Sequence, residues 1–495
     1  MGAPRSVRAS ILAGSAPANA MQLSRAPLPA FYIYEDLLTF WDTACANGVD
    51  ALLDHKNLTK SKAVFKVHPA MIQHAGEVLL PRALASNTQR VYDPQRAEYF
   101  IVPAYLGLNL FFCGGTNATG ANIIYLRDYL KNSPWFKRND GLDHMIVSSH
   151  FSALSKVYNK GKREQPLLPL LKKVCWAVQV ASSLFYSKAY SAMNSMVPVP
   201  LSEQPPPAAM LPWHSRPAKV FFGGQTHNAG IAYVARRALI KFAWTVKNIV
   251  YTTSECNPVG ASWAGNSCRH TNDVLKENKL VATNHSRAPL AWETNIKHPV
   301  RCLPFPSQNC SGYYLRPCPN RDLSMSDGCW AHHHQREGHL TMKRMAKAQY
   351  NLAWPGDHGL WSVSSRIYDG IAAGTVPVFL SHSIPHQTIA FHRHLPWDEM
   401  SIAIEHSTFT ANRNQAIEDA IKRAEADGPW MARALALLDK HAPDVLWRHP
   451  ESRVSENIVR SCAANRRAYK NGSVNRMYTY QQNEPKETPV LDLWD

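Results

Sequence analysis

Residues 350–380 combine glycines, hydroxyl groups, a carboxylate and one arginine at a spacing that suits a nucleotide diphosphate. Ser364 and Ser365 lie directly before Arg366, and Asp369 follows three positions later. An arginine side chain presents a fixed, always-charged fork of donors that suits a phosphate group. We therefore predict nucleotide binding by this group together with three residues of the flanking turns, Gly356, Asp357 and Gly374.

A strand–loop–helix–strand unit is expected to position these residues. An apolar strand over residues 350–354 leads into the polar loop 355–359, and a helix follows with Arg366 near its start. The small-residue turn 372–374 then leads into a second strand over residues 376–380. In parallel α/β sheets, ligands bind outside the carboxyl ends of the strands, where N–H groups at helix starts favour phosphates. The loop and the helix start are predicted to face that edge.

Each of these residues also has a plainer structural role open to it. Gly356 and Gly374 could serve only in tight turns, where glycine accepts a positive φ. Arg366 and Asp369, three positions apart on one helix face, could form an ion pair. Asp369 could orient the arginine, bind a ribose or take part in the chemistry, and the two serines could cap the helix, which is compatible with phosphate binding.

The unit resembles the exostosin-like glycosyltransferases, in particular exostosin-domain proteins of plant and algal type. The resemblance rests on the P-G-D loop, the serine–arginine pair with its acidic residue, and the G-x-x-P-V turn. Five further segments follow the family's order along the chain, at residues 31–37, 90–103, 141–150, 216–224 and 396–402.

This resemblance implies an α/β fold with two Rossmann-like lobes facing a cleft, the GT-B type. It implies inverting transfer of a sugar from a nucleotide sugar, expected to be UDP-linked, to a polysaccharide or glycoprotein glycan. No cofactor and no metal are expected, because positioned N–H dipoles and an arginine can stabilise the leaving diphosphate. The alternative is a catalytically inactive scaffold in a hetero-complex with another glycosyltransferase, since the resemblance implies such complexes for some members.

Such a transfer needs a base for the acceptor hydroxyl, and Asp143 with His144 is the expected catalytic pair. They are predicted at a strand end beside the cleft, and histidine titrates near neutrality. Asp357 and Glu405 are rival candidates. The plainer alternative is a buried histidine that is hydrogen-bonded to neighbouring backbone, and Phe151 stands where the family commonly has an aspartate.

The basic balance of the chain does not predict a nucleic-acid partner. A formal charge of +17 suggests an acidic partner, or basic lobes that flank a nucleotide. No basic run exceeds two or three residues, and no zinc-finger or RNP-type pattern occurs. The histidines at 332–334 and 339 lack helical i, i+4 spacing and a nearby acidic motif, so no metal site is predicted.

The cysteines and the N-glycosylation sequons indicate that the protein resides in an oxidising lumen. Six of the ten cysteines lie between Cys256 and Cys329, where disulfides are expected to staple a long loop. The remaining four are scattered, and the sequence does not give their pairing: Cys45, Cys113, Cys175 and Cys462. The N-x-S/T sequons, at Asn57, Asn117, Asn284, Asn309 and Asn471, point the same way.

The expected location is the Golgi lumen, which is the usual address that the resemblance implies. No stretch of this chain approaches the roughly 20 apolar residues that a membrane span requires, so no transmembrane helix is predicted. The protein would be membrane-associated only if an N-terminal anchor is missing from the sequence.

Four segments are expected along the chain. They are a disordered leader over residues 1–29, an acceptor-side lobe over 30–215 that ends in a proline-rich connector, a nucleotide-sugar lobe over 216–440 with a cysteine-rich insertion at 256–338, and a helix with a polar tail over 441–495 that packs back on the first lobe. Predicted strands cover residues 31–34, 99–103, 145–148 and 219–223. Predicted helices cover residues 64–84, 123–130, 167–192, 229–244, 413–426, 429–438 and 451–471.

Overall fold

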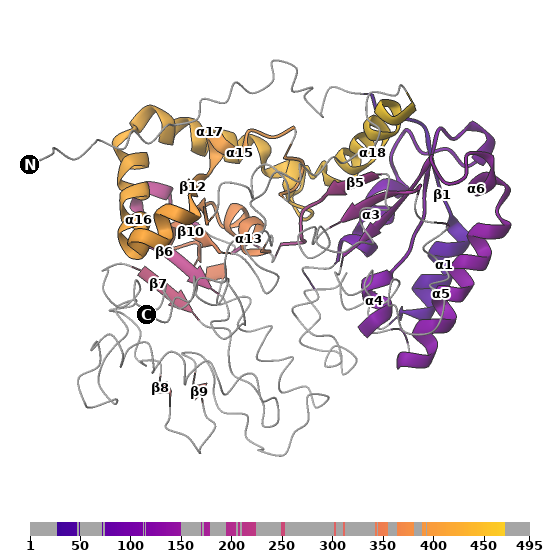
Figure 1. Ribbon diagram of the computed structural model, residues 1–495, viewed down its shortest axis with the longest axis horizontal. Coiled ribbons are helices and arrows are strands. Elements are labelled where there is room, and N and C mark those ends of the chain that lie inside the picture. Colours follow the sequence, from indigo (N-terminus) through magenta and orange to yellow (C-terminus); the bar gives the residue numbers. More distant parts are fainter. Residues whose placement is uncertain are drawn as a thin grey trace, which may run out of the picture.

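Two parallel sheets of five strands each organise the protein (Figure 1). The structure is a computed structural model that describes residues 27–46, 49, 72, 75–111, 113, 115–149, 170, 173–178, 195–203, 206–207, 210–223, 249–252, 301–302, 310–311, 342–343, 345–354, 364–380, 389–392 and 394–470. Alternation of parallel strands with helices confirms the predicted α/β class and agrees with a GT-B type. The cleft between two lobes and the domain bounds stay predictions.

The first sheet has its strands side by side in sequence order, without a reversal. The order is β1 (Phe31–Ile33), β2 (Tyr99–Ile101), β3 (His144–Ser148), β4 (Cys175–Val178) and β5 (Ser195–Pro198). Its helices are α1 (Glu35–Ala44), α3 (Gly76–Ala85), α4 (Leu106–Phe111), α5 (Gly115–Asn132) and α6 (Pro134–Arg138), with a short 3-10 helix at Pro94–Arg96.

Both faces of the first sheet are buried, so its strands read as nearly continuous apolar runs. Successive side chains point to opposite faces, and Met145 therefore packs in a core shared with Leu80 and Leu84 of α3. Ile146 packs on the other face, in a core shared with Trp41 of α1. Helices α1, α5 and α6 lie together on that side in Figure 1.

The second sheet reverses its winding at its centre. The order is β12 (Ile402–Ile404), β11 (Val376–Leu380), β10 (Ala348–Ala353), β6 (Ala218–Gly223) and β7 (Ile249–Thr252). The chain therefore leaves β6 toward one edge of the sheet and leaves β10 toward the other. Its helices are α13 (Arg366–Ala372), α15 (Trp397–Met400), α16 (His406–Ala426) and α17 (Gly428–Val445), with a 3-10 helix at Trp213–Ser215. A separate two-stranded antiparallel ladder pairs β8 (Arg301–Cys302) with β9 (Cys310–Ser311).

The start of α17 shows how local sequence sets an element. The Asp427 side chain accepts a hydrogen bond of 2.9 Å from the Trp430 backbone N–H, and Pro429 occupies the first turn. An acidic N-cap followed by proline is a favoured helix start, because proline lacks an N–H that would need a partner there.

The last described helix, α18 (Val454–Lys470), returns to the first sheet. It contacts β4, β5 and α3, and Figure 1 shows it beside them at the end of the chain's colour range. A disulfide joins Cys175 of β4 to Cys462 of α18. The Arg466 guanidinium also donates a hydrogen bond of 2.7 Å to the Glu98 carbonyl, next to β2.

Glu203 joins the segment after β5 to the segment between α17 and α18. Its buried carboxylate accepts hydrogen bonds from the backbone N–H groups of Trp447 at 3.0 Å and Arg448 at 2.6 Å. The Trp447 indole N–H donates to the Pro200 carbonyl at 2.8 Å. Burial raises the pKa of Glu203 to about 7, against the opposing effect of these N–H groups. This part of the proline-rich connector is therefore tied to the segment that leads into α18.

The β4–α18 disulfide should contribute measurably to stability. We expect a Cys175→Ser/Cys462→Ser variant to lose about 2–5 kcal/mol of unfolding free energy, because the crosslink restricts the unfolded chain. Denaturant unfolding with and without reductant checks this. Peptide mapping without reduction should recover Cys175 linked to Cys462 and Cys45 linked to Cys113. Free thiols at these four positions would contradict the structure.

One predicted helix is wrong. Residues 167–192 contain the buried strand β4, and the run Val174 to Val178 (VCWAV) accounts for this. Such a short apolar run, rich in β-branched and aromatic residues, suits a central parallel strand better than a helix. The leader, the helix at 229–244, the histidines at 332–339, the polar tail and all of the cysteine-rich insertion except β8 and β9 lie outside the described residues.

Candidate functional site

The reversal between β6 and β10 marks where a ligand would bind the second sheet. Open α/β sheets bind ligands outside the carboxyl ends of the strands where the strand order reverses. The chain that leaves the carboxyl end of β10 there begins the predicted nucleotide loop. Gly356 and Asp357 belong to that loop and lie outside the described residues. The described part of the site is therefore the strand end and the start of α13.

Helix α13 packs directly against β10, and two contacts set its position. The buried Asn351 side chain donates a hydrogen bond of 2.6 Å from Nδ2 to the Arg366 carbonyl. A Cβ atom at Gly370 would lie 2.6 Å from the same Nδ2 and 2.8 Å from Oγ1 of Thr375. Only glycine permits this approach, and it sets the position of the first turn of α13 relative to the strand end.

The first turn of α13 brings four predicted residues together. Arg366 Nη1 lies 2.8 Å from Oδ2 of Asp369, whose side chain is 1% exposed, whereas a quarter of the Arg366 side chain is exposed. Ser364 Oγ accepts a hydrogen bond of 3.3 Å from the Arg366 N–H, and Ser365 occupies the N-cap position without a side-chain cap bond. The structure contains the ion pair between Arg366 and Asp369 that the sequence offered as an alternative. It is compatible with a phosphate contact, since a guanidinium carries five N–H donors.

Gly374 lies at the opposite edge of the sheet, which corrects its predicted place beside the nucleotide. It follows the last turn of α13 and precedes β11, with φ 68°. A Cβ atom there would lie 2.7 Å from Nη2 of Arg216, whose Nη1 donates to the Ala348 carbonyl where β10 begins. The plainer alternative, a turn glycine, is the one that the structure supports.

Gly374→Ala should therefore destabilise the fold rather than remove a ligand contact. We expect a loss of about 1–3 kcal/mol in unfolding free energy, from the left-handed backbone and the contact with Arg216. Gly428→Ala is the matched control, because a Cβ atom there meets nothing within 4 Å and the residue lies in the first turn of α17. Denaturant unfolding of both variants tests this. Equal stability of the two would contradict the assignment.

Asp143 and His144 lie at the amino end of β3, not at the edge where a ligand is expected. Both side chains are fully buried. His144 Nδ1 lies 2.8 Å from Oδ1 of Asp143, and its Nε2 lies 2.8 Å from the Tyr34 hydroxyl. The ring also stacks on Phe100, with centroids 4.6 Å apart.

The surroundings of Asp143 favour its ionised form. Its Oδ2 accepts hydrogen bonds from Asn139 and, at 3.1 Å, from Arg138, and it lies 3.8 Å from Nη2 of Arg466 in α18. Burial alone would raise its pKa, but the hydrogen bonds from His144, Asn139 and Arg138 outweigh burial and lower the pKa to about 2.

His144 is neutral in this setting. Burial lowers its pKa, against the opposing effect of Asp143. Because an ionised carboxylate only accepts hydrogen bonds, Nδ1 carries the proton and Nε2 accepts the Tyr34 O–H. Both ring nitrogens are thus occupied inside the first core, and no acceptor hydroxyl reaches them in this arrangement. This geometry corrects the expected position beside a cleft and matches the buried-histidine alternative, with side-chain partners instead of backbone.

Of the rival bases, Glu405 is the one that the structure describes. It directly follows β12 at the carboxyl edge of the second sheet, is exposed, and occupies the N-cap position of α16 without a side-chain cap bond. Asp357 would leave the same edge but lies outside the described residues. No group of three or more metal-binding side chains occurs in the described ranges, and no helix within them is long and apolar enough to cross a membrane.

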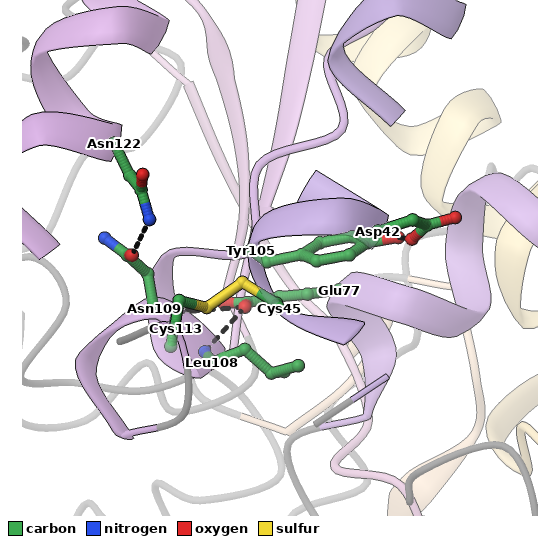
Figure 2. Close-up of a disulfide and its surroundings, with 9 residues drawn as sticks. Asp42, Cys45, Glu77, Tyr105, Leu108, Asn109, Cys113 and Asn122 are labelled. Carbon is green, nitrogen blue, oxygen red and sulfur yellow. Dashed lines mark hydrogen bonds between the residues drawn. A yellow bond between two sulfur atoms is a disulfide. The ribbon is translucent and has the colours of Figure 1, made fainter. Parts of the chain in front are cut away.

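The sequence also did not predict a buried carboxylate in the first sheet's surroundings. Glu77 of α3 lies at the carboxyl edge of the first sheet, beside the disulfide between Cys45 and Cys113 (Figure 2). The sequence carries one signal for it, an acidic residue in the first turn of a mostly apolar helix, since glutamate is rarely buried without partners.

Comparison with known proteins gives one family and several relatives. The Exostosin GT47 domain is matched over residues 51–280, which confirms the predicted resemblance. A probable glucuronoxylan glucuronosyltransferase of Arabidopsis thaliana is 34% identical over 83 residues, or 15% of this chain and 17% of that protein.

Two proteins of Oryza sativa subsp. japonica are similar over somewhat longer stretches. Both are probable glucuronosyltransferases, 28% identical over 123 residues and 27% identical over 122 residues. Each match covers 23% of this chain, and 28% and 27% of the respective relatives. The chain thus spans less than a third of the length of the curated relatives that it matches.

Proposed function

From the match to the Exostosin GT47 domain, we propose that this chain is a glycosyltransferase acting on a polysaccharide. The observation that carries the proposal is the β10–α13–β11 unit at the reversal of the second sheet. There Arg366, with Asp369 orienting it, follows the loop that leaves the central strand. A nucleoside diphosphate is the ligand class that this arrangement suits, because a guanidinium matches phosphate oxygens.

The donor that we propose is UDP-glucuronic acid, and the acceptor is a xylan chain. Support comes from the names of the relatives, which are probable glucuronosyltransferases, one of them of glucuronoxylan. The acceptor would bind at the carboxyl edge of the first sheet, opposite the donor. The two disulfides suit an oxidising compartment such as the Golgi lumen, which we propose as the location.

The reaction that we propose is a single inverting displacement. The acceptor hydroxyl oxygen bonds to C1 of the sugar as the bond between C1 and the diphosphate oxygen breaks. The base takes the hydroxyl proton, and UDP leaves with the bonding electron pair. Glu405 and Asp357 are the candidate bases, and Arg366 would stabilise the negative charge that grows on the diphosphate.

Calorimetry with UDP in the presence of EDTA, followed by an assay of transfer from UDP-glucuronic acid to xylohexaose, tests the proposal. We expect metal-independent UDP binding and a glucuronosylated product. UDP binding with transfer from a different UDP-sugar would change the donor and keep the enzyme. A folded chain that binds no UDP would overturn the proposal and favour the inactive scaffold in a complex with another glycosyltransferase.

A further inference from the structure

Glu77 is a fully enclosed carboxylate that the proposed reaction does not use. It is the second residue of α3 and is 2% exposed. Its Oε1 accepts hydrogen bonds from the backbone N–H groups of Gly107 at 2.9 Å and Ser149 at 2.8 Å. Its Oε2 accepts from Gly107 at 2.9 Å and from Leu108 at 3.3 Å. Figure 2 shows Glu77 directed at the start of α4.

The bonded amides belong to two neighbouring strand exits. Gly107 and Leu108 lie in the first turn of α4, which follows β2, and Ser149 directly follows β3. Strands β2 and β3 pair in parallel, so both exits lie at the same carboxyl edge of the first sheet. One carboxylate therefore fixes the backbone of both segments at the carboxyl edge of the first sheet, where the acceptor binds in the proposed function.

The segment after β2 is also fixed at other points. The buried Asn109 side chain accepts a hydrogen bond of 2.9 Å from Asn122 of α5, and Cys113 beyond α4 is joined to Cys45 beyond α1 (Figure 2). Helix α4 is thus held at its start by Glu77, along its length by α5, and beyond its end by the disulfide. The arrangement holds this backbone in one place.

A buried charge is a poor device for stability alone. Burial raises the pKa of Glu77 to about 7, and the three N–H groups oppose this without restoring the ordinary value. Apolar residues of similar volume often stabilise a core as well or better. The backbone that it holds in place better explains a carboxylate here. An ionised carboxylate only accepts hydrogen bonds, so it can bind several N–H groups at once.

Ionisable side chains of α1, of α3 and of the segment before α4 are hydrogen-bonded to one another. Arg82 of α3 donates to both oxygens of Asp42 in α1, each at 2.8 Å. The Tyr105 hydroxyl, on the segment between β2 and α4, lies 2.7 Å from Arg82 and 2.8 Å from Asp42. The described residues of α4 and of the β3 exit add no charged side chain.

We propose that Glu77 is a positioning residue for the acceptor. Its carboxylate fixes the backbone that follows β2 and the backbone that follows β3. The inference rests on the proposed function, in which the acceptor binds at this edge. Glu77 itself touches no substrate. Its loss should therefore raise the KM for the acceptor and leave donor binding and the turnover number nearly unchanged.

Glu77→Gln in the full chain tests the positioning directly. The amide keeps one acceptor oxygen but turns N–H donors toward at least one backbone N–H. We expect hydrogen exchange at Gly107, Leu108 and Ser149 to quicken about tenfold after correction for intrinsic rates, since each lost bond was to a charged acceptor. The same segments should loosen in the wild type as pH falls below about 7. Glu451→Gln, the same change on an exposed side chain, should match the wild type.

Kinetics separate positioning from a merely structural role. With UDP-glucuronic acid and xylohexaose, Glu77→Gln should raise the acceptor KM about tenfold, keep kcat within about twofold, and bind UDP as the wild type does. If the variant does not fold, the pH dependence of the wild-type acceptor KM carries the test, and it should rise below pH 7. A parallel loss of UDP binding, or an unchanged KM, would overturn the proposal.

Failure of the proposed function is distinguishable from failure of this inference. A wild-type chain that binds no UDP refutes the donor site whatever Glu77 does. A chain that binds UDP but does not glucuronosylate xylohexaose refutes that substrate pair and the acceptor role assigned here. In both cases, unchanged hydrogen exchange at Gly107, Leu108 and Ser149 in Glu77→Gln would also refute the role of Glu77 in fixing the segments after β2 and β3.

Discussion

Arg366→Ala should weaken UDP binding at least tenfold in calorimetry with EDTA. The expected loss is about 1.4 kcal/mol or more, because a hydrogen bond from an arginine to a phosphate is charge-assisted and often bidentate. Arg366 is a quarter exposed at the start of α13, whereas its partner Asp369 is almost fully buried. The guanidinium is therefore the charged group of this pair that a ligand can reach.

The variant also removes the ion pair of a buried carboxylate, so two controls are needed. Asp369→Asn removes the ion pair and keeps the guanidinium, and we expect it to lower stability more than it weakens UDP binding. Arg423→Ala removes the same charge from an exposed position at the end of α16 and should leave binding unchanged.

The comparison between these variants decides the role of the arginine. If Asp369→Asn loses UDP binding as completely as Arg366→Ala while both remain folded, the guanidinium does not bind UDP without the carboxylate that orients it. If Arg366→Ala binds UDP normally, the donor site lies elsewhere. Loss in Arg366→Ala alone would support the proposed donor contact.

The strand–helix–strand unit could be predicted closely, because its signals are local. Alternation of apolar runs with glycine and small-residue turns placed β11 at its observed bounds, and β10 is shifted by only two residues at its start and one at its end. Spacing of three along a helix also predicted the contact between Arg366 and Asp369 as one of two alternatives. These inferences need no knowledge of distant parts of the chain.

Gly374 was misplaced because nearness in sequence does not tell which edge of a sheet a turn occupies. In a parallel unit, the chain leaves the strand at the carboxyl edge and returns from the helix at the amino edge. The turn after α13 therefore had to lie away from the nucleotide, against Arg216, which is 158 positions earlier in the chain (374 − 216). Only the folded arrangement brings that arginine to the turn.

Contacts between distant segments account for the rest of what was missed. Cys175 and Cys462 are 287 positions apart, and the residues around each in the sequence give no hint of the other. Glu77 meets the amides of Gly107 and Ser149 only because β2 and β3 are neighbours in the sheet. The sequence of a single strand does not show which other strand it pairs with.

Asp143→Asn should destabilise the protein by about 3 kcal/mol while the folded variant still transfers sugar. The change removes the charge that holds His144, Arg138 and Asn139 together in a buried cluster, and breaking one side of a buried ionic group is costly. Asp140→Asn is the matched control, since Asp140 is exposed, pairs only at the surface with Lys173, and has a positive φ that asparagine tolerates. It should change stability by less than about 0.5 kcal/mol.

The contribution of Asp143 to the free energy of unfolding depends on pH. Asp143 has a folded pKa of about 2, below its ordinary value of 3.8. Its contribution is therefore present above about pH 4 and is lost as pH falls toward 2. His144, with its pKa lowered by burial, adds a loss in the same direction as pH falls below its ordinary value of 6.5. Asp143→Asn should flatten the acid part of the curve, whereas Asp140→Asn should not.

Transfer activity decides between the buried cluster and the catalytic pair that the sequence suggested. A general base contributes about 100- to 10,000-fold to a rate. If Asp143→Asn stays as stable as the wild type, binds UDP and yet loses transfer by that factor, the pair acts in chemistry and the burial described here does not persist in the working enzyme. If stability falls and the turnover number of the folded fraction is kept, Asp143 and His144 hold β3, α6 and α18 together, and the base is to be sought at the carboxyl edge of the second sheet.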